Sequence, residues 1–123
     1  MDTDNINPQS FMGANLNKSE QSYGMGKKLY NSAMDKLIDA KIRQGSDRNG
    51  IDSKVNEECN EIFRQSIPYL KNAIQYYDGL KDQENSDNRI RLFQSLNALG
   101  VAYYHLGMYE ELKPIKTRIE EYQ

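Results

Sequence analysis

Tryptophan is absent from this sequence of 123 residues, and cysteine occurs once, as Cys59. A lone cysteine excludes a disulfide within the chain and does not distinguish a reducing compartment from an oxidising one. Valine and threonine occur only as Val55, Val101, Thr3 and Thr117. The β-branched residues that strands favour are therefore nearly limited to isoleucine, and this shortage predicts an all-α protein.

The sequence also lacks an excess of positive charge and a long apolar run. The net charge of −2 and the pI of about 5.4 leave few cations to replace the counterions of nucleic acid, so we expect no nucleic-acid partner. No stretch approaches the roughly 18 apolar residues of a membrane span, and the polar start MDTDNINPQ does not read as a signal peptide. We expect a soluble chain whose compartment is unknown, exported or periplasmic only if a leader precedes the given sequence.

What the chain does contain is enough for one domain with a thin core. Its residues are 37% hydrophobic and 28% charged, and the mean hydropathy is −0.88. This is polar for a globular domain, yet too rich in Ile, Leu and Tyr for a disordered one. A chain of this length needs no disulfide or metal to fold.

The first half predicts a polar tail followed by one long hairpin. Residues 1–16 form the tail, in which a short helix can begin at Asn7 and Pro8. A capping pair at Asn17 and Glu20 and apolar spacings of three and four open the first long helix, which ends in QGSDRNGID. The second helix begins at Asp52 or Ser53 and stops at Gly79, so the hairpin spans 17–80.

The second half predicts a linker, 81–87, and a shorter hairpin, 88–122. The stretch LGVAYYHLGMYEEL forms its elbow. We expect Gly107 to permit the reversal and Gly100 to let the two helices approach closely. We also expect Tyr103 and Tyr109 to pack across the elbow. So short a connection requires antiparallel helices.

These residues resemble the tetratricopeptide (TPR) repeat, a helix-turn-helix unit of about 34 residues. The resemblance is carried by Leu99, Gly100 and Tyr103 in one helix and by Gly107 and Tyr109 at the turn. The following helix departs from the family pattern. Larger or charged residues replace its usual small and aromatic positions, and a proline lies near its start: Leu112, Pro114, Lys116 and Ile119.

The first half is similar to a second, stretched copy. Gly26 and Tyr30 match the family positions in its first helix, and SIPYLKNAIQYYD resembles the end of a repeat, with Ala73 at the small position. Such stretched hairpins resemble the C-terminal repeats of TPR proteins from Bacteroidetes-type bacteria. The resemblance implies two stacked antiparallel hairpins with about four helices in a right-handed superhelix. Because arrays usually need three or more units, we expect a homodimer or a part of a longer array.

The resemblance also implies where a partner would bind, because the first helix of each TPR hairpin lines the concave groove. The implied groove residues are Tyr23, Lys27, Tyr30, Asn31, Asn97, Val101, Tyr104 and His105. Aromatic, Asn and Lys side chains suit recognition of a peptide or protein. We therefore expect a non-catalytic protein-interaction module. The alternatives are that Tyr30 and Tyr104 only cover the edge of the core, and that the chain is a capping or oligomerisation hairpin without a groove.

The sequence offers weak candidates for catalysis or metal binding. Cys59 and His105 could form a nucleophile and base, but Cys59 falls on an apolar helix stripe, and a charged His105 would simply suit a helix C-terminus. The stretch GSDRNGIDSKVNE has part of a calcium-loop rhythm, yet Gly45 and Asn56 stand at its first and last ligand positions. We expect no enzyme activity, no metal and no cofactor.

Overall fold

A computed structural model describes residues 11–44, 53–80 and 86–121, and side chains within 21–43, 53–80 and 86–121. These ranges contain four helices and no strand, which confirms the all-α prediction. The helices are α1 (Phe11–Gln44), α2 (Ser53–Asp78), α3 (Ser86–Leu106) and α4 (Tyr109–Glu120). The calcium-loop-like stretch around Gly45 and Gly50 falls mostly outside the described residues.

The expected start of the first long helix at Asn17 is wrong, because α1 begins at Phe11 and runs for 34 residues. It passes through Gly13, a residue type that disfavours helix interiors. One glycine costs a helix only about 1 kcal/mol relative to alanine, and helix propagation is cooperative once a nucleus exists. The other helices begin and end close to their predicted limits, with Gly79 just after α2 and Leu80 packed on the core.

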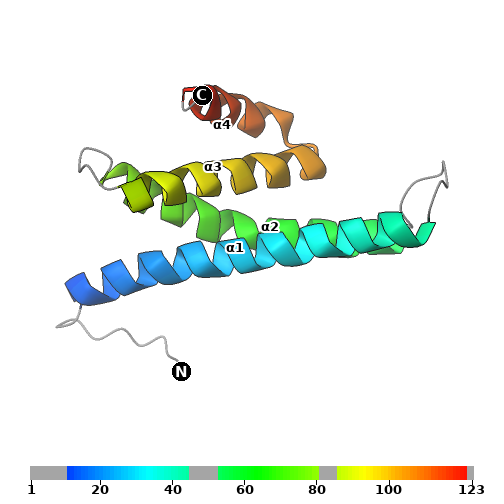
Figure 1. Cartoon of the computed structure of the whole chain (residues 1–123), viewed down its shortest axis with the longest axis horizontal. Helices are drawn as coiled ribbons and strands as arrows, with labels where there is room; N and C mark the ends of the chain where they lie inside the picture. The colour runs from blue at the N-terminus through cyan, green and yellow to red at the C-terminus, as the bar shows by residue number, and fades with distance from the viewer. Residues whose placement is uncertain (1–10, 45–52, 81–85, 122–123) are drawn as a thin grey trace.

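The four helices form two hairpins, α1–α2 and α3–α4, and the first hairpin contacts the second through α3 (Figure 1). α1 and α2 run antiparallel along the length of the molecule, and α3 packs against both of them. α4 folds back along α3 on the side away from α1. Over the described residues, no helix combines the length and apolar character that crossing a membrane requires.

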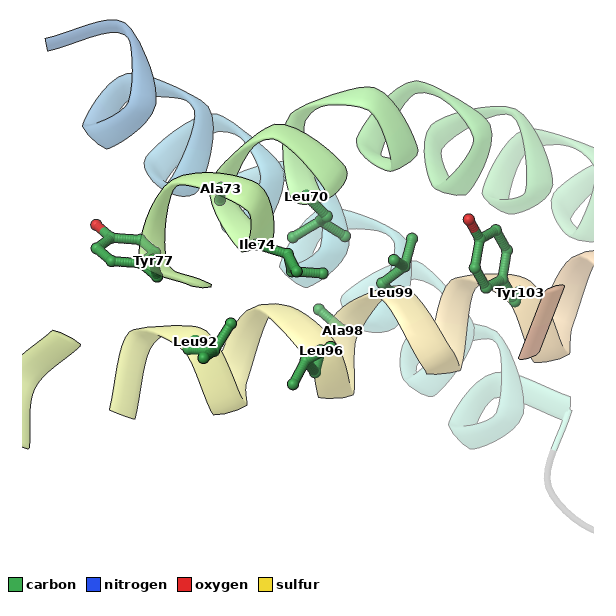
Figure 2. Close-up of a cluster of buried hydrophobic side chains, with 9 residues drawn as sticks. All are labelled: Leu70, Ala73, Ile74, Tyr77, Leu92, Leu96, Ala98, Leu99 and Tyr103. Atoms are coloured by element: carbon green, nitrogen blue, oxygen red, sulfur yellow. The ribbon is translucent and has the colours of Figure 1, made fainter. Parts of the chain in front are cut away.

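The larger of two core clusters lies between α2 and α3 (Figure 2). Leu70 on α2 and Leu92 and Leu96 on α3 are fully buried, and each such side chain stabilises the fold by about 1.5–3 kcal/mol. Side chains of α1 and α4 cover the cluster from either side, among them Tyr23 and Ile115. The α2–α3 contact therefore joins the two hairpins.

A second cluster lies between α1, α2 and the end of α3. Its centre is the fully buried Phe63 of α2, next to Cys59 on the same helix. Ala33 and Leu37 come from α1, and Ala102 from α3. The small residues let three helices meet around one aromatic ring.

The close helix approach lies at Gly26 rather than at Gly100. A Cβ atom on Gly26 would lie 2.8 Å from Leu70 Cδ2 and 3.3 Å from the Leu70 backbone nitrogen, so α1 and α2 exclude a side chain here. A Cβ atom on Gly100 would make ordinary contacts of 3.5–3.6 Å with α4. The expectation that Gly100 is needed for the approach of α4 is therefore wrong.

The elbow between α3 and α4 is a Schellman turn around Gly107, whose φ is +73°. The Met108 N–H donates to the Tyr103 carbonyl at 2.9 Å, and the Gly107 N–H donates to the Tyr104 carbonyl at 3.1 Å. The reversal at Gly107 is confirmed. The expected packing of Tyr103 on Tyr109 is wrong: Tyr103 is buried in the core, and the ring of Tyr104 meets Tyr109 edge-on at 6.2 Å.

Candidate functional site

The candidate site is the face formed by α1 and α3, where hydrogen bonds join the two helices at Gln94. The Tyr23 hydroxyl donates to Gln94 Oε1, and Lys27 Nζ donates to the same oxygen at 3.2 Å. Lys27 Nζ also lies 5.6 Å from the centre of the Tyr23 ring, at cation–π distance. The structure thus brings together two predicted groove residues and a third that the sequence analysis did not select.

Tyr23 is held from several directions and is half-buried. Its ring meets the buried Tyr77 of α2 edge-on at 5.9 Å, and the guanidinium carbon of Arg91 lies 6.0 Å from the ring centre. Because its hydroxyl already donates to Gln94, Tyr23 is a structural part of the site and does not present a free hydroxyl to a partner. It fixes the position of Lys27 and Gln94 at the surface.

Two shallow hollows adjoin this junction. One, of about 650 Å³, lies along α1 and includes Lys27, Lys28 and Asn31 in its lining. The other, of about 550 Å³, lies along α3 and is lined by residues including Ile90 and Gln94. Since Lys27 and Gln94 are hydrogen-bonded to each other, the two hollows are neighbours on one face.

Further along α3, the same face presents Asn97, Val101 and Tyr104. Asn97 is exposed, Val101 is half-buried against the second cluster, and Tyr104 is 58% exposed. The spacing of four and three residues places them on one stripe of the helix. Asn31, Asn97 and Tyr104 are therefore the predicted residues most open to a partner.

The remaining two predicted residues, Tyr30 and His105, both pack against the ring of Phe63 in the core. Tyr30 lies 6.4 Å from Phe63, and His105 stacks on Phe63 at 5.0 Å with an interplanar angle of 5°. Burial raises the pKa of Tyr30 above its usual value. Both side chains are half-buried, so they connect the α1/α3 face to the core and expose only part of their surface.

The surroundings of His105 disfavour the charged form that the sequence analysis considered for it. Burial and, to a lesser extent, the positive charge of Lys41 lower the pKa of His105 below 6.5. The neutral ring is therefore favoured, because protonation would place a cation near Lys41 in a partly desolvated position. This lowered pKa opposes the charged form that would suit the helix C-terminus.

The Cys59 and His105 side chains do not form an exposed reactive pair. Cys59 is 0% exposed within the second cluster, as the apolar stripe predicted. Burial raises the pKa of its thiol, and the opposing effect of Lys36 is smaller; the thiolate needed for nucleophilic attack is disfavoured. Among the described residues, no three His, Cys, Asp or Glu side chains gather closely enough to hold a metal ion.

Gln94 and Ile90 were not among the predicted site residues, although the sequence contains a signal for both. Asn97, Val101 and Tyr104 define a stripe on α3, and extending that stripe backwards by three and seven residues gives Gln94 and Ile90. Ile90 is about half exposed. The stripe therefore continues to the first turns of α3, beyond the positions that the repeat resemblance implied.

The chain matches no family model, no curated protein and no solved structure.

Proposed function

We propose that this chain is a non-catalytic protein-interaction module with a TPR-like arrangement, and that the α1/α3 face binds a peptide or partner protein. The exposed residues Asn31, Asn97 and Tyr104 would contact the partner, together with Lys27 and Gln94. Tyr23, Tyr30, Val101 and His105 would hold this face in shape.

One observation carries the proposal: Lys27, which lines the hollow along α1, is hydrogen-bonded to Gln94, which lines the hollow along α3. The bond leaves amide and ammonium groups at the surface between an exposed isoleucine, Ile90, and an exposed tyrosine, Tyr104. Apolar anchors flanked by fixed polar groups are typical of surfaces that bind extended chains. Aromatic anchors such as Tyr104 commonly dominate the energy of such contacts.

The surface of α4 supports a second candidate, a structural capping hairpin. None of the α4 residues is buried, and its outer surface carries exposed charged residues, including the Glu110–Lys113 ion pair at 3.2 Å. Helices that close a repeat array have a polar outer face of this kind. In that case the chain would terminate a larger assembly, and the α1/α3 face would have no partner of its own.

A capture experiment with matched variants separates the two candidates. Wild-type protein, an Asn97→Arg, Tyr104→Ala variant and a Tyr69→Ala control are immobilised, and lysate of the source organism is passed over each. Tyr69 is a suitable control because it is an exposed tyrosine on α2, outside the α1/α3 face. Tyr30 is left unchanged because its contact with Phe63 would confuse folding with binding.

We expect a protein that wild type and the Tyr69→Ala control retain and that the α1/α3 variant loses. Titration calorimetry with that purified protein should then show at least a tenfold weaker Kd for the variant, a change of about 1.4 kcal/mol. Equal retention by all three proteins, each folded by circular dichroism, would favour the capping role and contradict binding at this face.

A further inference from the structure

A groove lies between α2, α3 and α4, on a different surface from the α1/α3 face. It has a volume of about 420 Å³, and its floor is largely apolar, formed by Ile74, Leu99, Tyr103 and Ile115. Tyr103 is 5% exposed, and no hydrogen bond among the described residues uses its hydroxyl. The groove therefore offers apolar surface and an unused polar group to an occupant.

The rims of the groove carry opposite charges. α2 and α4 both run antiparallel to α3, so they are parallel to each other. Asp78 of α2 and Arg118 of α4 form an ion pair at 2.6 Å across the two rims. Lys71 and Glu111 each lie seven residues, about two helical turns, before the members of that pair. Both are exposed, and neither has an ion-pair partner within the described ranges.

A ridge with a complementary pattern lies near the end of α1. Ile38 and Ile42 are 50% and 72% exposed, and their spacing of four residues places them one above the other. Asp35 and Lys41 lie three residues before and after Ile38, about 60° to either side of it on the helix. Both charges are exposed, and neither is ion-paired in the described part of the chain.

The ridge is accessible because α1 and α2 extend past the elbow between α3 and α4 (Figure 1). An acidic and a basic residue flank its apolar centre, just as a basic and an acidic residue flank the apolar floor of the groove. Isoleucines one turn apart form the kind of ridge that packs into a groove between helices. The two surfaces of one chain are thus complementary in both polarity and charge.

We propose that this chain associates head to tail, with the Ile38–Ile42 ridge of one copy seated in the α2/α3/α4 groove of the next. Asp35 then faces Lys71 of the neighbouring copy, and Lys41 faces its Glu111. Because ridge and groove are different surfaces, every added copy leaves one ridge and one groove free, and association continues beyond a dimer unless a ring closes. This arrangement extends a chain of about two hairpins into a longer array.

Sedimentation equilibrium of the whole chain tests the proposal. The weight-average mass should rise above the 14.3 kDa of one chain as concentration increases towards roughly 1 mM, where even a weak interface becomes populated. Ile42→Glu should abolish the increase, because it places a charge on the ridge. Gln75→Trp should also abolish it, because Gln75 lines the groove and an indole would occupy that space. Position 75 is exposed on α2, so the fold should tolerate the change.

Mixing the two variants distinguishes this arrangement from a symmetric dimer. The Ile42→Glu chain retains a groove and the Gln75→Trp chain retains a ridge, so an equimolar mixture should form a one-to-one complex and stop there. A charge exchange gives a second readout. Asp35→Lys and Lys71→Glu should each weaken association roughly two- to fivefold, and the two together should restore it.

Three results would overturn the proposal. The first is a wild-type chain that stays monomeric over the whole concentration range. The second is undiminished association of either variant alone. The third is a mixture of the two variants that remains monomeric although circular dichroism shows that each variant is folded.

Discussion

At Gly26 the backbones of α1 and α2 come close enough to exclude a side chain. We expect Gly26→Ala to lower the free energy of unfolding by about 1–3 kcal/mol, because the new methyl group would meet Leu70 at 2.8 Å and its backbone nitrogen at 3.3 Å. Urea unfolding followed by circular dichroism measures the change.

Gly24→Ala is the matched control for Gly26, on the same helix two residues away. Nothing lies within 4 Å of the position that its Cβ would occupy. Alanine is the better helix former by about 1 kcal/mol, so this variant should be as stable as wild type or more stable. Equal destabilisation by both substitutions would contradict the close approach at Gly26.

His105 should make the stability of the protein depend on pH. Its pKa is lowered in the folded state, so the unfolded chain binds the proton more readily. This contribution to stability is complete above about pH 6.5, the pKa of an unfolded histidine, and is lost as the pH falls through the lowered folded value. We expect a decline in the free energy of unfolding below pH 6.5 that His105→Gln reduces.

Unfolding in urea at several pH values between about 7.5 and 5 measures this effect. Carboxyl groups also titrate towards the lower end, so the difference between wild type and His105→Gln isolates the histidine. Parallel pH profiles for the two proteins would show that the environment of His105 does not favour its neutral form.

At the scale of the helices, the α3–α4 hairpin contains two glycines with different roles. Gly107 has a φ of +73°, a left-handed conformation in which a Cβ is strained by about 1–2 kcal/mol. Gly100 has ordinary helical geometry and space for a methyl group against Leu112, Ile115 and Ile119. We expect Gly107→Ala to destabilise the protein and Gly100→Ala to stabilise it by up to about 1 kcal/mol.

Thermal and urea unfolding of both variants test the hairpin. A loss of stability in Gly100→Ala as large as that in Gly107→Ala would mean that α4 lies closer to α3 than the structure shows. From the sequence we expected a structural role for both glycines, because a sequence pattern marks a glycine without showing whether a contact requires it.

Helix limits could be predicted from the sequence where a local signal exists. The turn at Gly107 depends on a glycine and its immediate neighbours, and the apolar spacing of α2 and α3 repeats over several turns. The start of α1 could not be predicted in this way, since the capping pair at Asn17 and Glu20 is a local signal that lies inside the longer helix. The choice between Tyr103 and Tyr104 as the partner of Tyr109 depends on the rotation of α3 against α2, which is a long-range contact.

The same limit applies to the candidate site. Spacing and resemblance were enough to place four site residues on the first helix of each hairpin, α1 or α3: Lys27, Asn31, Asn97 and Tyr104. The same periodicity places Gln94 on this stripe of α3. Its bonds to Tyr23 and Lys27 could not be predicted, because they depend on the register between α1 and α3, in which residues 67 and 71 positions apart meet. Similarly, no local signal distinguishes a His105 that stacks on Phe63 from one that faces a groove.

At the scale of the whole molecule, the reactivity of Cys59 measures how often the second cluster, between α1, α2 and the end of α3, unfolds. Because the thiol is fully buried and its pKa is raised, labelling should require unfolding. We expect reaction with a disulfide reagent to be at least about a thousandfold slower in buffer than in concentrated urea, as an unfolding free energy of about 5 kcal/mol implies. Rapid labelling of the folded protein would contradict this packing and reopen Cys59 as a nucleophile.

Site-specific photo-cross-linking in the source organism is the most direct test of the proposed binding of a partner to the α1/α3 face. A benzophenone side chain is introduced at Asn97, on this face, or at Tyr69, on the exposed side of α2. We expect a discrete cross-linked species of higher mass from position 97 that position 69 does not give. The same products from both positions, or none from position 97 in the folded protein, would contradict it.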